Sequence, residues 1–459
     1  MVQKGVLFQI IAAFAATLGA MTMGTILGWS SPSLTILPDA VSFPVTLDDA
    51  AYYGSVFGIG AFFGSIPAGK ISTFIGRCNS MIIYELFIIM GWIILTIPNA
   101  MWMLIGGRLL QGVGVGGLCA IIPSYIGEIT EPKIRGTLSA SFQIFICIGI
   151  LYSFALGSVT KYVVFNVLCG IWALFHVLGA IMIPESPYIL LSKNKDEQAK
   201  VSLKKFRDGN DDAISKELSS IKNEIETQRN QKNSFMQVLA DRVNRKSIFI
   251  GVGCMFFQQT SGINVIVFYM SYIFKITESS ISPQTASISV GVVQVIITCI
   301  AMAVIDKLGR RILLLVSAIL MSISCAGLAI YFIMIQHDMS PKAFAWLPLT
   351  FVVLYILAFA IGFGPVPWVV MGEIFSNEVK PYGTSLATAT NWGLVFLVTY
   401  YSNEITKLIG FNGLFIMFSI FCILAAVFVW IFVPETKNKT FAEIQLELGG
   451  NLPSTSTGP

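Results

Sequence analysis

The chain is dominated by twelve apolar segments, each close to the length that crosses a lipid bilayer. About 20 predominantly apolar residues are needed to span about 30 Å of hydrocarbon as a helix. A helix is the expected form because every backbone polar group must find a partner within the lipid. We therefore predict an all-α membrane protein with 12 transmembrane helices. The segments are 6–29, 50–69, 80–97, 102–124, 138–159, 162–183, 247–274, 285–305, 312–335, 346–371, 383–406 and 412–433.

The segments form two groups of six, separated by a charged stretch. In that stretch Ile214, Leu218, Ile221 and Ile225 recur at helical spacing, which predicts a short amphipathic helix. The final residues have no periodicity and few apolar side chains, so we expect a largely disordered tail. The sequence thus predicts a six-helix bundle over 1–183, a cytosolic helical linker over 184–246, a second six-helix bundle over 247–437 and a cytosolic tail over 438–459.

Three motifs of the first group recur in the second group. Parallel repeats of six spans place a substrate site at their interface near the membrane midplane and permit rocking between two open states. We therefore predict two pseudo-symmetric bundles with a binding site between them. The repeated pairs are TFIGRC at 73–78 and DKLGRR at 306–311, GEITEPKIRGT at 127–137 and GEIFSNEVKPYGT at 372–384, and IPES at 183–186 and VPET at 433–436.

The distribution of charge indicates how the spans are oriented. Cationic loops are retained on the cytosolic side of the membrane. Of the 29 Lys and Arg residues, Lys161, Lys275, Lys342 and Lys407 fall on the other side of the predicted topology. We therefore expect a multi-pass membrane protein with both termini in the cytosol. The plasma membrane is the expected location, with an internal membrane as the alternative. This topology accounts for the net charge of +4, so no nucleic-acid partner is expected.

Cysteine usage and the remaining motifs limit the chemistry. Eight cysteines lie in or beside the predicted spans without a CxxC pair, which predicts neither a disulfide nor a metal site. The chain shows no nucleotide motif and no acid–base constellation. We therefore expect no cofactor and no enzymatic activity, and no obligate protein partner is evident.

Eight short motifs, in order along the chain, resemble the sugar porter branch of the major facilitator superfamily. They are Gly107-Arg108, PSYIGEI at 123–129, PESP at 184–187, QQTSGIN at 258–264, DKLGRR at 306–311, GFGPVPW at 362–368, NW at 391–392 and PETK at 434–437. Within that branch, GWSSPSL at 28–34 is similar to the facilitative hexose and insect trehalose transporters. The resemblance implies a facilitative uniporter of a hexose or trehalose that works by alternating access.

Four residues depart from the pattern of that family. Thr73 stands where Asp is usual, Cys78 where a second basic residue is common, and Tyr188 and Lys380 where Arg is usual. Lys380 keeps the charge of Arg but lacks its planar, bidentate fork. The departures predict a weaker charge network at the cytosolic ends of the spans.

The stretch FFQQTSGINVIVFY at 256–269 carries amides inside an apolar span. Polar side chains in the membrane normally face a bundle interior or a wet cavity, and amides present donors and acceptors that match sugar hydroxyls. Gln259 and Asn264 do not share a face with Gln258 on an ideal helix, although a break at Ser261-Gly262 would turn them inward. The competing interpretation is hydrogen bonding between helices. The resemblance implies sugar contacts for Gln258, Gln259, Asn264, Gln143, Gln294, Asn391, Trp392 and Trp368.

A second set of residues is charged and clusters at the predicted cytosolic ends of the spans. We expect opposite charges there to pair when the cytosolic side is shut and to separate when it opens, which would bias the two states. The competing interpretation is that they anchor helix ends at lipid headgroups. The set is Arg77, Glu128, Arg135, Glu185, Asp306, Arg310, Arg311, Glu373, Lys380 and Glu435.

The mode of coupling is predicted from the first and fourth spans. Proton-driven members of the family carry an Asp in the first span that faces the Arg of the fourth. Here Arg108 is present, but the first span has no ionisable residue after Lys4, which predicts pH-insensitive uniport. We expect Glu85 and His176 to reach toward the headgroups or to bond locally. A proton-coupled sugar symporter and a sugar-binding nutrient sensor are the alternatives.

Overall fold

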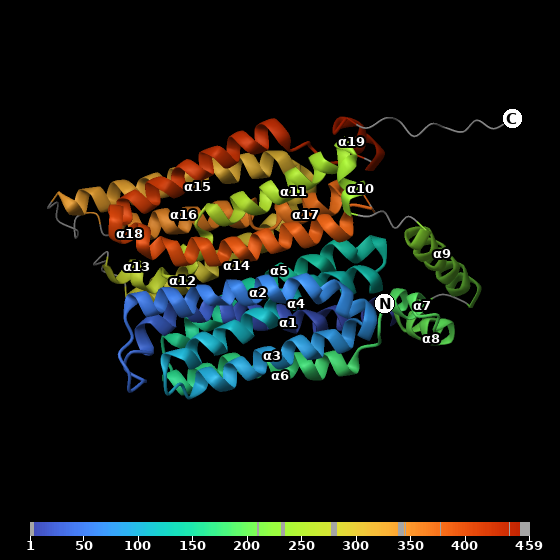
Figure 1. Ribbon diagram of the computed structural model, residues 1–459, viewed down its shortest axis with the longest axis horizontal. Helices are drawn as coiled ribbons and strands as arrows, with labels where there is room; N and C mark the ends of the chain where they lie inside the picture. Colours follow the sequence, from blue (N-terminus) through green and yellow to red (C-terminus); the bar gives the residue numbers. More distant parts are fainter. Residues whose placement is uncertain are drawn as a thin grey trace.

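The computed structural model describes residues 4–208, 211–230, 235–276, 282–337, 344, 346–376, 378–439 and 441–449. Its repeating elements are helices, which pack as two halves side by side (Figure 1). The first half contains α1 (Lys4–Ile36), α2 (Leu47–Ile75), α3 (Arg77–Thr96), α4 (Met101–Ile129), α5 (Pro132–Gly157) and α6 (Tyr162–Met182). The second half contains α11 (Arg242–Thr260), α12 (Ile263–Phe268), α13 (Met270–Ile276), α14 (Pro283–Leu308), α15 (Arg310–Gln336), α16 (Leu347–Ile361), α17 (Val366–Ile374) and α18 (Lys380–Phe432).

The linker and the tail add shorter helices at one end of the molecule. We call this the linker end and the opposite one the far end (Figure 1). The added helices are α7 (Pro187–Ser192), α8 (Asp196–Phe206), α9 (Asp211–Asn230), α10 (Phe235–Ala240) and α19 (Phe441–Glu447).

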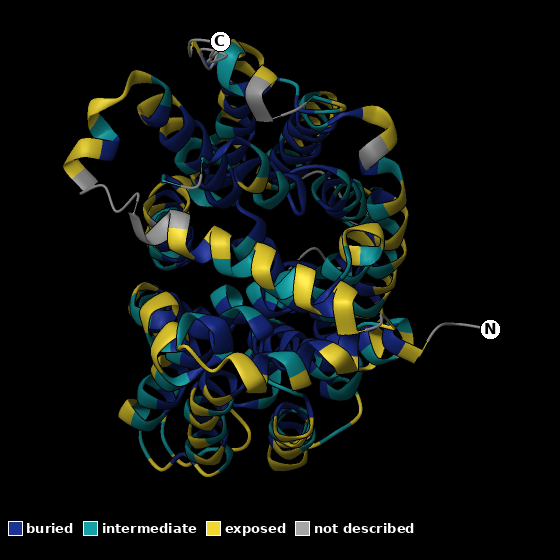
Figure 2. Ribbon diagram, turned by 90° about the vertical axis from the view of Figure 1, so that its right-hand side faces the viewer, coloured by how far each residue is buried: buried dark blue, intermediate teal, exposed yellow. Residues whose placement is uncertain are grey.

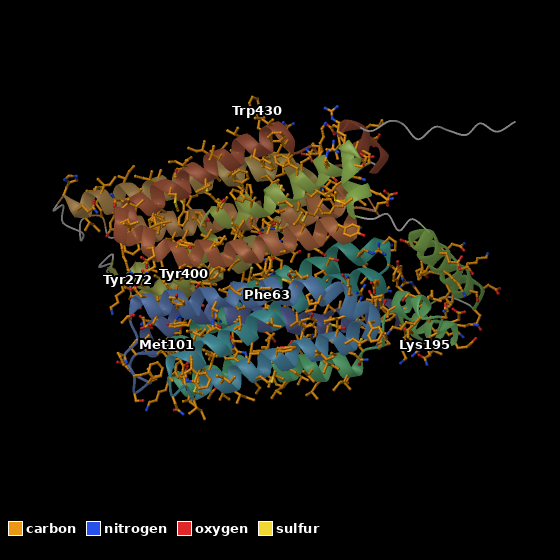
Figure 3. All side chains as sticks on the ribbon, in the orientation of Figure 1. Phe63, Met101, Lys195, Tyr272, Tyr400 and Trp430 are labelled. Carbon is orange, nitrogen blue, oxygen red and sulfur yellow. The ribbon has the colours of Figure 1, made fainter. Side chains whose placement is uncertain are left out.

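The prediction of an all-α protein with twelve spans is confirmed. Ten helical segments of the described chain are long and apolar enough to cross a membrane. One of them, Tyr382–Phe432, contains the last two predicted spans, which meet at Gly410, where φ is +72°. The second predicted span lies within α2. Large apolar side chains such as Trp430, which is 66% exposed, cover the outer surface (Figure 3), as expected for a surface in contact with lipid.

Two spans are broken near their middle. The predicted break in the seventh span is present, because α11 ends at Thr260 and Gly262 has a φ of +93° before α12 begins. A residue with a side chain rarely adopts this conformation, so glycine suits the position. The break in the tenth span, between Ile361 and Val366, differs from the continuous segment that we expected over 346–371. Two prolines there remove helical N–H donors.

Helix α11 begins earlier than the predicted bundle boundary at 247. It starts at Arg242 because Asp241 caps it, with Oδ1 accepting the backbone N–H groups of Val243 at 2.6 Å and Asn244 at 3.3 Å. Side-chain caps of this type satisfy donors that the first turn leaves free. The predicted start of the second bundle, which was based on apolar length alone, is therefore five residues later than the observed start of α11.

The linker helices are fastened to the first half. Gln9 Nε2 in α1 donates to the carbonyl of Phe206 at 2.7 Å, and Arg207 Nη1 donates to the carbonyl of Ile129 at 2.9 Å. The predicted amphipathic helix is α9, whose Ile214 and Ile225 are buried. This part of the chain therefore forms one body with the first half.

The prediction of a largely disordered tail is wrong for residues 441–447, which form α19. Ile444 and Leu448 are buried, and Gln445 Nε2 donates to the carbonyl of Ile374 at 3.0 Å. Lys246 Nζ donates to the carbonyl of Leu448 at 2.9 Å. The short apolar face of this segment finds a partner in the second half, which composition alone does not reveal. Residues 450–459 lie outside the described part of the chain.

Candidate functional site

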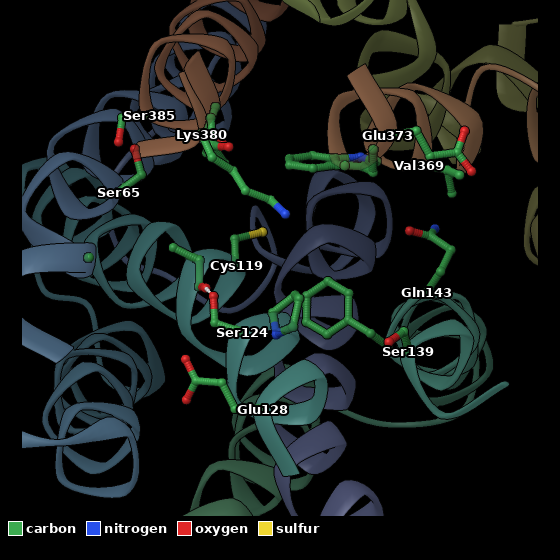
Figure 4. A pocket seen from close by; sticks show the side chains of 18 of the residues that line it. Ser65, Cys119, Ser124, Glu128, Ser139, Gln143, Val369, Glu373, Lys380 and Ser385 are labelled. Carbon is green, nitrogen blue, oxygen red and sulfur yellow. Dashed lines mark hydrogen bonds between the residues drawn. The ribbon is translucent and has the colours of Figure 1, made fainter. Parts of the chain in front are cut away.

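A cavity of about 3250 Å³ lies between the two halves. Its walls come from α2, α4 and α5 on one side and from α14, α17 and α18 on the other. Tyr188 and Lys193 of the linker also line it, so the cavity opens at the linker end, where the linker helices lie in front of it (Figure 2). Cys119 and Lys380 point into the cavity from different halves (Figure 4).

Contacts between the halves close the far end. The hydroxyls of Ser31 in α1 and Ser271 in α13 lie 2.8 Å apart. The ring of Phe57 in α2 packs edge to face against Trp392 in α18, with centroids 5.7 Å apart. At the rim, Lys407 Nζ lies 2.5 Å from Asp48 Oδ1. The molecule is therefore open at the linker end and closed at the far end.

The rim pair responds to pH in a defined direction. Hydrogen bonds from Lys407 and then Asn403 lower the pKa of the Asp48 carboxyl, and the same ion pair raises the pKa of Lys407. Because the pKa of Asp48 is lowered, its contribution to closure is present above the ordinary carboxyl pKa. That contribution is lost as pH falls through the lowered value. Both side chains are exposed, so salt screens the pair and its effect is modest.

The predicted sugar-contacting residues occupy four different positions. Gln143 and Trp368 line the cavity. Trp392 packs against Phe57 in the closed interface, and Gln294 is buried away from the described cavity lining. The remaining four are Gln258, Gln259, Asn264 and Asn391, which form a chain of amides.

The amide chain joins spans seven and eleven. Asn391 Nδ2 donates to Gln258 Oε1 at 2.6 Å, and Gln259 Nε2 lies 3.5 Å from the same oxygen. Asn264 Nδ2 donates to Gln259 Oε1 at 2.5 Å. The break at Gly262 thus lets Asn264 of α12 bond back to Gln259 of α11, a contact that the sequence did not predict. In this state the amides are bonded to protein groups, which agrees with the competing interpretation of hydrogen bonding between helices.

The sequence analysis missed several small polar residues of the cavity wall. Ser65 and Ser124 donate to carbonyls of their own helices at 2.9 Å and 2.7 Å, and Thr388 of α18 also lines the cavity. Hydroxyls bonded in this way are satisfied without a ligand, yet can turn toward one. Serine and threonine are common in membrane helices, so no sequence signal marks these residues.

The three repeated motifs meet at the linker end of the first half. Arg77 Nη2 lies 2.6 Å from Glu128 Oε1. Glu185 accepts the backbone N–H groups of Arg77 at 2.9 Å and Cys78 at 3.3 Å, where free donors and the helix dipole favour a carboxylate. The cluster thus ties together the ends of α3, α4 and α6.

The second half repeats this arrangement. Arg310 Nη2 lies 2.8 Å from Glu373 Oε1. Glu435 accepts the backbone N–H groups of Arg310 at 2.9 Å and Arg311 at 3.1 Å. Arg311 Nη2 also donates to the carbonyl of Trp430. The internal repeat of the sequence therefore corresponds to two equivalent charge clusters.

Gly76 and Gly309 precede α3 and α15, the two helices whose first backbone N–H groups bond a Glu carboxylate. Gly309→Ala should lower the free energy of unfolding by about 1–3 kcal/mol, because alanine is strained in the backbone conformation of Gly309. Gly309 has a φ of +92°, and an added Cβ would lie 2.6 Å from Glu435 Oε2. Thermal unfolding in detergent measures the loss. Gly372→Ala in α17 is the matched control, since an added Cβ there meets nothing within 4 Å. Equal stability of the two variants would contradict this role.

The predicted behaviour of the charge network needs a correction. The Arg77–Glu128 and Arg310–Glu373 pairs each lie within one half and are formed while the linker end is open. The expectation that they separate on opening is therefore wrong. Arg135 and Lys380 lie at the cavity and have no ion pair with another described residue. The side chain of Asp306 lies outside the described residues.

The expectation for Glu85 and His176 is also wrong. Neither reaches the headgroups: both are fully buried in the first half, and His176 Nδ1 lies 2.5 Å from Glu85 Oε2. The pair joins α3 to α6, and Gly19 of α1 packs against the imidazole, where an added Cβ would lie 2.5 Å from Cε1. Residues 91 apart in sequence form this contact, so local spacing does not reveal it.

Arg108 is fully buried in the same half. Its guanidinium donates to the carbonyls of Ile26 at 3.1 Å and Tyr53 at 3.3 Å, and to Gln111 Oε1 at 3.0 Å. It also stacks over the Phe57 ring, 4.9 Å from its centroid. Carbonyls, an amide and an aromatic face therefore stabilise this cation.

Comparisons with known proteins agree with this architecture. A family model described as "Sugar (and other) transporter" matches residues 12–448. Facilitated trehalose transporters of Polypedilum vanderplanki and Bombyx mori are 34% and 35% identical over 97% and 96% of this chain, and the matches cover 88% and 86% of those proteins. A relative from Anopheles gambiae is 35% identical, but this chain spans 56% of that longer protein.

The fold is similar to that of the xylose transporter XylE from E. coli in a partially occluded inward open conformation. The TM-score is 0.80 at 24% identity, and the match covers 94% of this chain and 99% of that one. XylE bound to 6-bromo-6-deoxy-D-glucose gives a TM-score of 0.79 over 96% of this chain and 99% of that one, also at 24% identity. The family model covers most of the chain, so the chain belongs to the sugar transporter family, and its fold agrees with this.

Proposed function

We propose that this protein carries an uncharged sugar across a membrane by alternating access. The observation that carries the proposal is the cavity between the halves, open at the linker end and closed at the far end by contacts between α1 and α13 and between α2 and α18. Rocking of the halves would close the linker end and open the far end. The charged residues that line the cavity, among them Glu128, Glu373 and Arg135, lie at its mouth. Gln143 and Trp368 present neutral groups to the cavity, as suits an uncharged substrate.

The substrate that we propose is trehalose or a hexose. Relatives that are 34–35% identical are named facilitated trehalose transporters, and amide and aromatic groups suit either sugar. We assign the sugar contacts to Gln143 and Trp368 in the open cavity, together with the amide chain of Gln258, Gln259, Asn264 and Asn391. Trp392 and Gln294 would join the site after the halves move.

We further propose facilitative uniport. The partners of Arg108 are not ionisable, so protonation of a counter-ion cannot release it. One observation favours the second candidate, proton-coupled symport, because the buried Glu85–His176 pair is a titratable element within the first half. The excess of Lys and Arg at one side supports cytosolic termini, so the linker end would face the cytosol, and the plasma membrane is the location that we propose.

Counterflow in liposomes containing the purified protein tests transport and substrate together. Vesicles preloaded with unlabelled trehalose or D-glucose should accumulate the labelled sugar, while L-glucose should not compete. Uptake should be unchanged by a protonophore and at two pH values if the protein is a uniporter. Net uptake that is driven by an imposed proton gradient and is lost on addition of the protonophore would favour the symporter, and no saturable, stereoselective flux would overturn the proposed function.

Gln143→Ala should raise the KM for sugar about tenfold with a smaller effect on the maximal rate, because it removes hydrogen bonds made in the open cavity. Uptake measured over a range of sugar concentrations gives both values. Gly136→Ala is the control, because this glycine of the same helix also faces the cavity and an added Cβ meets nothing within 4 Å. An unchanged KM in Gln143→Ala would remove this residue from the site.

A further inference from the structure

The break in the tenth span leaves a carbonyl without its helical donor. In an α-helix the carbonyl of Phe363 would accept the N–H of residue 367, but residue 367 is proline and has none. Val366 N–H already bonds the carbonyl of Gly362 at 3.0 Å, so the next bond of the ladder is the missing one. Gln258 replaces it, since its Nε2 lies 2.6 Å from the carbonyl oxygen of Phe363.

The breaks in the seventh and tenth spans are bonded to each other in both directions. Gln258 Nε2 from span seven also lies 3.0 Å from the carbonyl oxygen of Gly364 in span ten. In return, the Tyr355 hydroxyl of span ten donates to the carbonyl of Ser261 at 3.0 Å. Each break thus has its exposed backbone satisfied by a side chain of the other span, which buried backbone groups require.

The hydrogen-bonding capacity of Gln258 is fully used in this state. A carboxamide has two N–H donors and one oxygen with two lone pairs. The donors go to Phe363 and Gly364, and the oxygen accepts from Asn391 at 2.6 Å with Gln259 at 3.5 Å. The residue is 4% exposed. A sugar hydroxyl can therefore bind Gln258 only by displacing one of these partners.

We propose that Gln258 is a positioning residue that fastens the break before α17 to α11, and that sugar binding exchanges its bonds to the break carbonyls for bonds to the sugar. The exchange would free α17, which carries the cavity residue Trp368 and the charge-cluster residue Glu373. A sugar that binds better to the released arrangement shifts the population toward it. The inference rests on the proposed function, because it makes Gln258 the link between sugar binding and helix movement.

Gln258→Leu, with or without Pro367→Ala, tests the exchange in transport. Gln258→Leu removes both bonds to the break before α17, so the maximal rate should fall about tenfold, in addition to the rise in KM that follows from the lost sugar contact. Pro367→Ala restores an N–H for Phe363 and should recover a large part of that rate. Asn264→Leu is the matched control: Asn264 bonds Gln259 within the same span, so this variant should raise KM without rescue by Pro367→Ala. If Gln258→Leu behaves like Asn264→Leu and Pro367→Ala does not restore its rate, the proposal is overturned.

A second measurement does not depend on any substrate. Cys119 lines the cavity, so its modification by a maleimide, followed site by site with mass spectrometry, reports opening of the linker end. In sugar-free protein, modification should be slower in Gln258→Leu, recover with Pro367→Ala and stay unchanged in Asn264→Leu. Equal rates in all variants would overturn the positioning role. A protein that shows these differences yet transports no sugar would refute the proposed function alone.

Discussion

Gly58→Trp should abolish transport, because the far end can no longer close. Gly58 of α2 faces the eleventh span in the closed interface, and an added Cβ would lie 2.6 Å from the backbone nitrogen of Phe396 and 3.0 Å from the carbonyl oxygen of Trp392. Backbone atoms cannot rotate away as a side chain can. An indole would therefore hold α2 and α18 apart. The free energy of the state with a closed far end would rise, relative to the state with an open far end, by more than the few kcal/mol that separate such states.

Two measurements check the Gly58 prediction. Counterflow should fall to background, and maleimide modification of Cys119 should slow because the cavity no longer opens at the linker end. Gly106→Trp is the matched control, since this glycine of α4 has nothing within 4 Å of an added Cβ. Transport near the wild-type rate in Gly58→Trp would show that the α2–α18 contact is not required for closure.

Glu85→Ala should cost about 3–5 kcal/mol of stability, because it leaves a polar partner unpaired in a fully buried site. His176 would then face apolar surroundings and the tightly packed Gly19. The melting temperature in detergent should fall well below that of the wild type. Glu85→Gln should cost less, because an amide still bonds the imidazole.

A double replacement separates loss of the pair from loss of volume. Glu85→Leu combined with His176→Phe removes both polar groups while filling the space, and such exchanges are often neutral for buried pairs. We expect this variant to recover most of the stability lost in Glu85→Ala. Its pH dependence of transport should match that of the wild type if the protein is a uniporter. A Glu85→Ala protein as stable as the wild type would contradict a structural role for the pair.

The fold was largely predictable because its determinants are local or repeated in the sequence. Apolar length located the spans, and Ser261-Gly262 marked the break in span seven. The repeated GR, GEI and PE motifs predicted two equivalent halves, and the structure brings each set together through Glu185 and Glu435. These features depend on length, on glycine and on a carboxylate at a helix start, all of which are visible in the chain.

The site was predictable in its residue types but not in its present contacts. The amide chain forms from the predicted residues, yet Gln258 bonds the backbone of span ten, and this depends on how two broken helices pack. The Glu85–His176 pair likewise joins helices distant in sequence. Small hydroxyl residues of the cavity wall, such as Ser65 and Ser124, have no distinguishing pattern. The Gln258 contacts, the Glu85–His176 pair and the cavity hydroxyls all depend on which helices pack together, and a single sequence does not reveal this.

The attachments of the linker and of α19 give each half of the molecule a reference point at the linker end. Helices α7 to α9 follow the first half through Gln9 and Arg207, whereas α19 follows the second half through Gln445. Fluorescent dyes at Lys195 and Glu443, on exposed surface of these two attachments, would thus form a molecular ruler for the angle between the halves. Single-molecule energy transfer between them would follow each turnover in real time while leaving the sugar route unlabelled.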